Sequence, residues 1–252
     1  MIFKELEKLR KMKTIQNGIT PRWKALLFDL DGTLVYTLPS LTRASNDMLE
    51  HYGLQAISEE EMLPLVGYGA RRQVEGLLKY RGAAQDISLE EAHGVYLRVF
   101  QERCTYRNRP YPGLTDLLFD AQEAGLRLGI LTNKPDEMAQ KVSRKSYPLD
   151  LFELIQGELP GVPLKPDPSS LLQACGKLGL SAEECLYVGD SEVDIAYARN
   201  ASCPCCSVLW GYRDEALLRK EHAEFYVRSV EDFRSLLGLQ TEFSPFSEPH
   251  RP

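Results

Sequence analysis

The chain contains 252 residues, of which 43% are hydrophobic and 26% charged, and its formal net charge is −6. This composition is typical of a globular protein with a substantial core, so it argues against a disordered chain and against a disulfide-stapled miniprotein. The mild acidity disfavours broad binding to nucleic acid or anionic membranes, and no apolar run reaches the roughly 18 residues that a membrane span requires.

The first segment, up to about residue 20, mixes charges of both signs and ends at the turn-forming residues 17–21. Ile2, Leu6 and Leu9 lie at helical spacing, which predicts a short amphipathic helix. The segment lacks the apolar stretch of a secretory signal. The Cys203–Cys206 cluster has no second CxxC or HxxxH partner, so we expect buried, reduced thiols rather than a zinc site, and a cytoplasmic location.

Short apolar runs recur along the rest of the chain, and we predict that they are strands covered on both faces, as in a parallel sheet. They span residues 24–30, 126–132, 184–190, 206–210 and 224–227. Helical patterns lie between them, at residues 114–121, at residues 168–179 and around residues 195–199. The alternation of strand and helix predicts a doubly wound, mostly parallel α/β sheet.

Residues 38–107 break this alternation, because their apolar residues follow helical spacing with almost no strand signal. The clearest case is the series Leu89, Ala92, Tyr96, Val99 and Phe100. We therefore predict an all-helical domain inserted after the first strand. The expected division is an N-terminal extension (1–22), an α/β core (23–37 and 108–240), a helical cap (38–107) and a C-terminal tail (241–252).

Polar residues follow the predicted strands, at the edge where ligands bind in open α/β sheets. They are Asp29 and Asp31, then Thr132 and Asn133, then Asp190 and Asp194, with Lys165 in a loop before a predicted helix. Carboxylates gathered at one edge repel one another unless a cation lies between them. Hard oxygen ligands favour Mg²⁺, so the sequence predicts a magnesium site.

This set of side chains suits the transfer of a phosphoryl group. A cation and a lysine offset the charge of the phosphoryl group, while a threonine hydroxyl donates a hydrogen bond to it. Of two aspartates two residues apart, one can attack phosphorus to form an acyl phosphate. The other can protonate the leaving oxygen and then take a proton from water.

The motifs resemble those of the haloacid dehalogenase-like phosphohydrolase superfamily. Asp29-x-Asp31-Gly-Thr33 is similar to its first motif, Thr132-Asn133 to its second, Lys165-Pro166 to its third and Gly189-Asp190-Ser-x-x-Asp194 to its fourth. The helical insertion lies where the family has its type-1 cap, and the resemblance implies a Rossmann-like core.

The resemblance also implies roles for these residues. Asp29 would be the nucleophile and Asp31 the general acid/base. Thr132 and Lys165 would hold the phosphate, with Asn133 a further substrate-binding residue. Mg²⁺ would be bound by Asp29, Asp190 and the backbone carbonyl of Asp31, with Asp194 near the metal or in its second coordination shell.

Three segments, residues 66–72, 132–135 and 210–213, are similar to the phosphoglycolate phosphatase-like branch. In the first of them, Arg71 is either part of a solvated basic face or reaches a substrate carboxylate. One departure lies at Tyr36-Thr37, where such proteins often have Asp-Ser, in the segment that joins core and cap.

We therefore expect a Mg²⁺-dependent phosphatase that hydrolyses a small phosphomonoester, with 2-phosphoglycolate as the leading substrate. The alternatives are a sugar-phosphate phosphatase, a pyrophosphatase or a β-phosphoglucomutase-like phosphotransferase of the same superfamily, and a non-catalytic magnesium-binding regulatory protein. The expected partner is a small phosphorylated metabolite, with no nucleic acid or membrane. The sequence leaves the oligomeric state open.

Overall fold

The computed structural model describes residues 22–239, and its centre is a six-stranded sheet in which every neighbouring pair of strands is parallel. The strand order is β5-β4-β1-β6-β7-β8. The strands are β1 (Ala25–Phe28), β4 (Arg127–Pro135), β5 (Leu154–Glu158), β6 (Cys185–Gly189), β7 (Cys205–Val208) and β8 (Phe225–Val227). The sheet confirms the predicted fold class, and β5 is a strand that the sequence patterns did not reveal.

The central strand β1 shows why these runs are strands without polar alternation. All four of its residues are buried. Leu26 and Phe28 belong to the hydrophobic cluster on one face of the sheet, and Leu27 belongs to the cluster on the other face. Because side chains alternate across a strand and both faces are covered, the whole run must be apolar.

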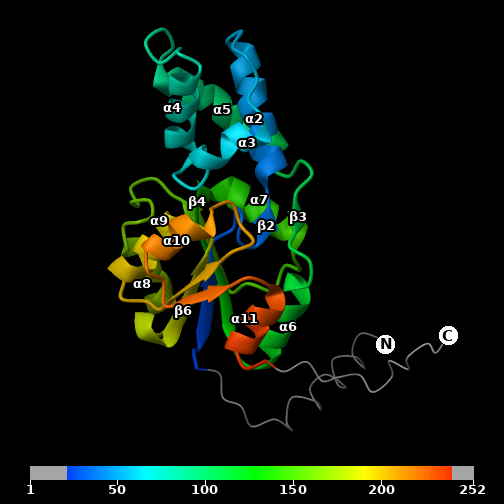
Figure 1. The fold of residues 1–252 in the computed structure, drawn as a ribbon, viewed down its shortest axis with the longest axis vertical. Helices are drawn as coiled ribbons and strands as arrows, with labels where there is room; N and C mark the ends of the chain where they lie inside the picture. Colours follow the sequence, from blue (N-terminus) through cyan, green and yellow to red (C-terminus); the bar gives the residue numbers. More distant parts are fainter. Residues whose placement is uncertain (1–21, 240–252) are drawn as a thin grey trace, which may run out of the picture.

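In the described part of the chain, six helices cover the two faces of the sheet (Figure 1). Apolar residues of α6 (Leu114–Glu123), α7 (Asp136–Ser146) and α11 (Val230–Leu236) pack into the first cluster. Apolar residues of α8 (Ser169–Lys177), α9 (Glu192–Asn200) and α10 (Glu215–Lys220) pack into the second. This arrangement is a doubly wound α/β fold, with β1 at the middle of the sheet.

A separate group of helices lies beyond one end of the sheet, as Figure 1 shows. They are α2 (Leu38–His51), α3 (Glu59–Met62), the 3₁₀ helix η1 (Leu63–Leu65), α4 (Ala70–Tyr80) and α5 (Leu89–Arg103). Two short antiparallel strands, β2 (Val35–Tyr36) and β3 (Arg109–Pro110), carry the chain out to this group and back. The helices fall in the interval predicted for the cap, whose limits stay a prediction.

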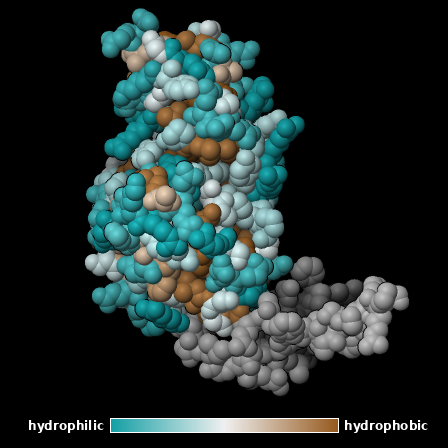
Figure 2. Space-filling view, viewed as in Figure 1, coloured by the Kyte–Doolittle hydropathy of each residue, from teal (hydrophilic) through white to brown (hydrophobic). Residues whose placement is uncertain are grey.

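In Figure 2, hydrophilic residues cover most of the visible surface, and hydrophobic residues show in patches, one of them where the cap helices meet the sheet domain. The six cysteines are buried and none is in a disulfide, as expected. Among residues 22–239, no helix has the length and apolar character needed to cross a membrane. The predicted N-terminal helix and C-terminal tail lie outside the described residues. Of the predicted N-terminal extension (1–22), only residue 22 is described.

Candidate active site

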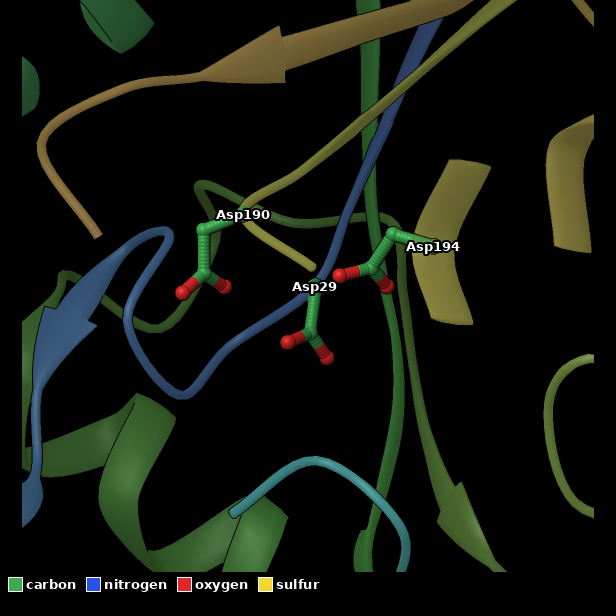
Figure 3. Close-up of side chains that lie close together, drawn as sticks. All are labelled: Asp29, Asp190 and Asp194. Carbon is green, nitrogen blue, oxygen red and sulfur yellow. The ribbon is translucent and has the colours of Figure 1, made fainter. Parts of the chain in front are cut away.

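Three carboxylates that the sequence analysis proposes as site residues meet at the carboxyl ends of β1 and β6. Asp29, Asp190 and Asp194 each offer an oxygen that lies within 4.8 Å of the others, and all three residues are buried (Figure 3). Asp29 follows β1, and Asp190 follows β6 directly. Since β1 and β6 pair in register from Ala25 with Cys185 to Phe28 with Val188, the residues after them are forced into proximity.

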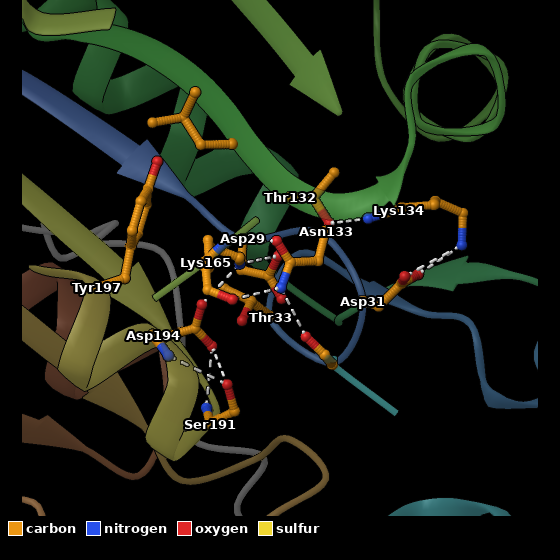
Figure 4. A network of polar contacts seen from close by, with 12 residues as sticks. Asp29, Asp31, Thr33, Thr132, Asn133, Lys134, Lys165, Ser191, Asp194 and Tyr197 are labelled. Atoms are coloured by element: carbon orange, nitrogen blue, oxygen red, sulfur yellow. Dashed lines mark hydrogen bonds and ion pairs between the residues drawn. The ribbon is translucent and has the colours of Figure 1, made fainter. Parts of the chain in front are cut away.

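The ammonium group of Lys165 lies between two of these carboxylates (Figure 4). Its Nζ is 2.7 Å from Asp29 Oδ1, 2.8 Å from Asp194 Oδ1 and 3.0 Å from the hydroxyl of Tyr187. Burial would lower the pKa of Lys165, but Asp194 and Asp29 raise it above its ordinary value. The lysine is therefore a permanent positive charge beside Asp29.

Asp194 orients this lysine and begins a helix at the same time. Its Oδ2 accepts hydrogen bonds from the backbone N–H of Ser191 at 3.1 Å and from the Ser191 hydroxyl at 2.5 Å, which closes a capping box at the start of α9. Its Oδ1 accepts from Lys165 and from Tyr187 at 3.2 Å. Both oxygens of Asp194 are thus engaged by protein donors.

Asp190 is held with its carboxylate facing the loop after β1. Its Oδ1 accepts from the Thr33 hydroxyl at 3.0 Å, and its Oδ2 accepts from the backbone N–H of Tyr212 at 2.8 Å. A Cβ at Gly32, which has φ of +86°, would lie 2.4 Å from Asp190 Oδ2, so only glycine fits there. The loop after β1 and the loop after β7 therefore converge on this carboxylate.

Burial raises the pKa of two of the carboxylates, which makes them weaker acids. Desolvation raises the pKa of Asp29 to about 6, although Lys165 lowers it. Desolvation, followed by the charges of Asp194 and Asp29, raises the pKa of Asp190 to about 8. Without a cation, the cluster thus resists carrying all of its negative charges at neutral pH.

The donor set fits a hard divalent cation. Oxygens of Asp29 and Asp190 lie close together, and burial, followed by the neighbouring carboxylates, raises the pKa of both groups, so a divalent cation between them would stabilise their ionised forms. Asp194 borders the cluster, but its oxygens already accept four contacts from protein groups. A direct metal bond from Asp194 would require it to release one of them.

Asp31 lies apart from the three carboxylates and has its own partners. Lys134 Nζ donates to Oδ1 at 2.9 Å and to Oδ2 at 3.1 Å, and the Thr37 hydroxyl donates to Oδ1 at 2.6 Å. Thr37 is half of the Tyr36-Thr37 departure. Its hydroxyl thus gives the segment joining core and cap a direct contact with Asp31.

Thr132 and Asn133 come at the end of β4 and reach the site in different ways. Thr132 is buried and lines the cavity beside Asp29. The Asn133 amide instead joins two loops: it accepts from the Lys165 backbone N–H at 2.8 Å and donates to the carbonyls of Lys165 and Gly67 at 3.1 and 3.0 Å. Its side chain fixes the loop that carries Lys165 against the cap.

A cavity lies between this edge of the sheet and the cap, with about 380 Å³ of empty space that is partly open to solvent. Asp29, Asp31 and Thr132 line its core side, and cap residues close the other side. Arg71 does not line it. The Arg71 side chain is 56% exposed, and its guanidinium lies 3.9 Å from Glu90. The structure thus brings together every predicted site residue except Arg71.

Two residues at this site were given no role from the sequence. Lys134 follows Thr132 by two positions. Residues two positions apart in a strand point to the same side, so this spacing could have indicated that Lys134 faces the site together with Thr132. Tyr212 accepts hydrogen bonds from the backbone N–H groups of Thr37 and Leu38, at 2.7 and 3.0 Å. No sequence pattern shows that contact, because the residues are more than 170 positions apart.

Comparison with known proteins gives a consistent result. The family model described as "Hydrolase: haloacid dehalogenase-like hydrolase" matches residues 23–202. A phosphoglycolate phosphatase from Yersinia pseudotuberculosis is 32% identical over 217 residues, which cover 86% of this chain and 94% of that protein. An N-acetylmuramic acid 6-phosphate phosphatase from Pseudomonas aeruginosa is 33% identical over 192 residues, which cover 76% of this chain and 84% of that protein.

A solved structure, that of a predicted phosphoglycolate phosphatase from Haemophilus somnus, superposes on this chain with a TM-score of 0.77. The two sequences are 28% identical, and the match covers 85% of this chain and 98% of the other. The similarity therefore extends over the sheet domain and the cap helices together.

Proposed function

The chain belongs to the haloacid dehalogenase-like hydrolases and is a phosphomonoester hydrolase, and from this premise we propose that it uses Mg²⁺ and an aspartyl-phosphate intermediate to hydrolyse 2-phosphoglycolate. The observation that carries the proposal is the meeting of Asp29, Asp190 and Lys165 at one edge of the sheet. Its substrate is a small phosphorylated molecule, and the cavity beneath the cap, which Asp29 and Thr132 line, is the proposed place of binding.

Asp29 is the proposed nucleophile. Its carboxylate lines the cavity, and Lys165 at 2.7 Å holds it in place through Oδ1, which leaves Oδ2 for attack. When a carboxylate oxygen bonds to phosphorus, the ester oxygen leaves and an acyl phosphate remains. A nucleophile held near the phosphoryl group avoids most of the entropic barrier of a bimolecular encounter.

Asp31 is the proposed general acid and base. It lines the same cavity as Asp29, two residues further along the loop. In the first half-reaction it would give a proton to the leaving oxygen, and in the second it would take a proton from the attacking water. Thr37 and Lys134 fix the orientation of its carboxylate.

Lys165 and Thr132 are the proposed phosphate ligands, because both are buried, Thr132 lines the cavity beside Asp29, and Lys165 contacts Asp29 directly. The carboxylates of Asp29 and Asp190, together with the carbonyl of Asp31, are the proposed ligands of Mg²⁺, with Asp194 supporting them through Lys165. A bound divalent cation would offset the negative charge of the phosphoryl oxygens. Asn133 supports the site by holding the Lys165 loop.

2-Phosphoglycolate is the proposed substrate because relatives that act on it align over most of this chain. The second candidate is a sugar phosphate, and the N-acetylmuramic acid 6-phosphate phosphatase supports it at similar identity over a shorter span. Both relatives are named for substrates that carry a carboxylate as well as a phosphate ester.

A phosphate-release assay tests the proposal. The panel contains 2-phosphoglycolate, N-acetylmuramic acid 6-phosphate, β-glucose 1-phosphate and pyrophosphate, each with Mg²⁺ and with a chelator. We expect the highest kcat/KM for 2-phosphoglycolate and loss of activity with the chelator. A higher kcat/KM for the sugar phosphate would replace the substrate, and activity in the chelator would remove the metal from the account.

A further inference from the structure

The cavity has one positive charge on its wall. Among residues 22–239, the only lysine or arginine that lines it is Lys134, near the carboxyl end of β4. The side chain of Lys134 is 1% exposed, and its Nζ lies 4.6 Å from the centre of the Phe100 ring in α5. A cation between the core and the cap therefore faces the space where a substrate must lie.

The other cations near the cavity are already engaged. Lys165 is occupied by Asp29, Asp194 and Tyr187. Arg213 donates to Glu192 and to the carbonyls of Leu63 and Val66. Arg71 is exposed beside Glu90.

Lys134 is different because its partner is one carboxylate, that of Asp31. An ammonium group has three N–H donors, and Asp31 is the one carboxylate among its described contacts, so the ammonium group can share its donors with a second anion that enters the cavity. A buried lysine of this kind forms a strong charge-assisted hydrogen bond with a carboxylate that enters the cavity.

The two lysines contact neighbouring aspartates of one loop. Lys165 contacts Asp29, and Lys134 contacts Asp31, two residues further along the chain. Asp29, Asp31 and Lys134 line the same cavity. A substrate whose phosphoryl group lies at Asp29 therefore shares this cavity with the ammonium group of Lys134.

We propose that Lys134 is a specificity-determining residue that binds a carboxylate carried by the substrate beside its phosphate ester. The proposal rests on the proposed phosphatase function and deepens it by assigning the substrate class to this side chain in place of Arg71. The apolar side chains of Leu41, Val66 and Phe100 cover the cap side of the same space and offer no competing charge.

The test compares two esters of the same length. 2-Phosphoglycolate carries the carboxylate, and its amide, 2-phosphoglycolamide, carries a neutral group of nearly equal size. The variants are Lys134→Met, which keeps the length of the stem beside Phe100 but removes the charge, and Lys134→Arg, which keeps the charge. The measured quantity is the ratio of kcat/KM for the acid to kcat/KM for the amide.

In the unaltered enzyme we expect this ratio to exceed one by at least about tenfold, because the contact is a hydrogen bond between two charges. Lys134→Met should bring the ratio close to one, and Lys134→Arg should keep it well above one. If Lys134 served only to hold Asp31, Lys134→Met would slow both esters equally and leave the ratio unchanged. That result would overturn the proposal.

A binding measurement covers the case in which the variants do not fold. 3-Phosphonopropionate, which cannot be hydrolysed, matches 2-phosphoglycolate in length, and propylphosphonate lacks its carboxylate. In the unaltered enzyme we expect 3-phosphonopropionate to inhibit at a concentration at least about tenfold lower; equal inhibition constants would overturn the proposal. If neither ester released phosphate, both the proposed function and the inference would be contradicted. If both were hydrolysed and the ratio of kcat/KM for the acid to that for the amide were near one, the inference alone would be contradicted.

Discussion

The two walls of the cavity differ in kind. The wall formed by the sheet edge carries every charge among the described lining residues, namely Asp29, Asp31 and Lys134. The wall formed by the cap carries none, and its lining side chains are apolar, aromatic or, at Gln73, an amide. In the proposed reaction, bonds would therefore be made and broken on the core side, where Lys134 would also bind the substrate carboxylate, while the cap would limit the size of the substrate and exclude water.

Removal of the proposed nucleophile on the sheet-edge wall should have the largest effect on activity. Asp29→Asn should lower kcat by at least about a thousandfold, because an amide oxygen does not attack phosphorus. The fold should persist, since the amide is close to the carboxylate in size. Phosphate release and circular dichroism measure the two effects.

Asp150→Asn is the matched control for that variant, because residue 150 is exposed between α7 and β5. It should leave kcat within about a factor of two of the unaltered enzyme. Near-normal activity in Asp29→Asn would assign the attack to another group.

The charge of the sheet edge also predicts how pH and metal act on stability. The pKa of Asp190 in the folded, metal-free protein is raised to about 8, against 3.8 for the ordinary group. Folding therefore favours the protonated form, and this contribution to stability is present below about pH 4 and is lost as the pH rises toward 8. Mg²⁺ should offset the loss because it binds the ionised carboxylates.

Thermal unfolding with and without Mg²⁺, at pH 5 and at pH 8, measures this effect. The rise in Tm on adding Mg²⁺ should be larger at pH 8 than at pH 5. In Asp190→Asn the dependence on pH should weaken. An equal rise at both pH values in the unaltered protein would contradict a metal site at these carboxylates.

A smaller effect is expected from the contact that sets the position of the cap wall. Arg213, whose side chain is 8% exposed, donates to the carbonyls of Leu63 and Val66 at 2.9 and 2.7 Å and to Glu192 at 3.0 Å. Arg213→Gln should raise KM by roughly three- to tenfold with a lesser change in kcat, because losing the guanidinium weakens the contact between core and cap; this change in KM corresponds to roughly 0.7–1.4 kcal/mol.

Arg219→Gln is the control, because Arg219 is 52% exposed and pairs with Glu215 on the surface of α10. Such a pair contributes about 0–1 kcal/mol, so KM should stay near that of the unaltered enzyme. If both variants gave the same KM, the Arg213 contacts would have no part in holding the cap wall over the cavity.

The two walls also differ in how far the sequence predicts them. On the sheet edge, Asp29 and Asp190 each follow an apolar strand, Thr132 lies near the end of another, and parallel strands end at the same edge. The residue order along the chain is then enough to predict that they meet. The structure adds the individual contacts of these side chains, such as the capping box that engages Asp194 and directs it toward Lys165.

The cap wall was less predictable because it depends on the rotation of helices. Successive helical residues point about 100° apart, so whether Arg71 or Gln73 faces the cavity depends on how α4 packs. The structure leaves Arg71 exposed and buries Gln73, whose amide donates to the Tyr96 hydroxyl at 2.8 Å. Helical spacing indicates that a face is buried, but it does not tell which neighbour covers it.

The strand β5 was missed for a related reason. Its sequence, Leu-Ile-Gln-Gly-Glu, is short and carries polar residues, because it lies at the edge of the sheet and only part of it is buried. Central strands such as β1 are apolar throughout and are visible in the sequence. Predictability therefore falls from the apolar strands, which include the opposite edge strand β8, to the partly polar β5 and to the cap.

The most direct test of the central claim is to locate the phosphoryl group during turnover. Enzyme mixed with labelled substrate is quenched within a single turnover, and the label is mapped by mass spectrometry of peptides. We expect a transient acyl phosphate on Asp29 that forms and decays fast enough to account for kcat. Label on a different residue, or turnover without any phosphorylated enzyme, would contradict the account.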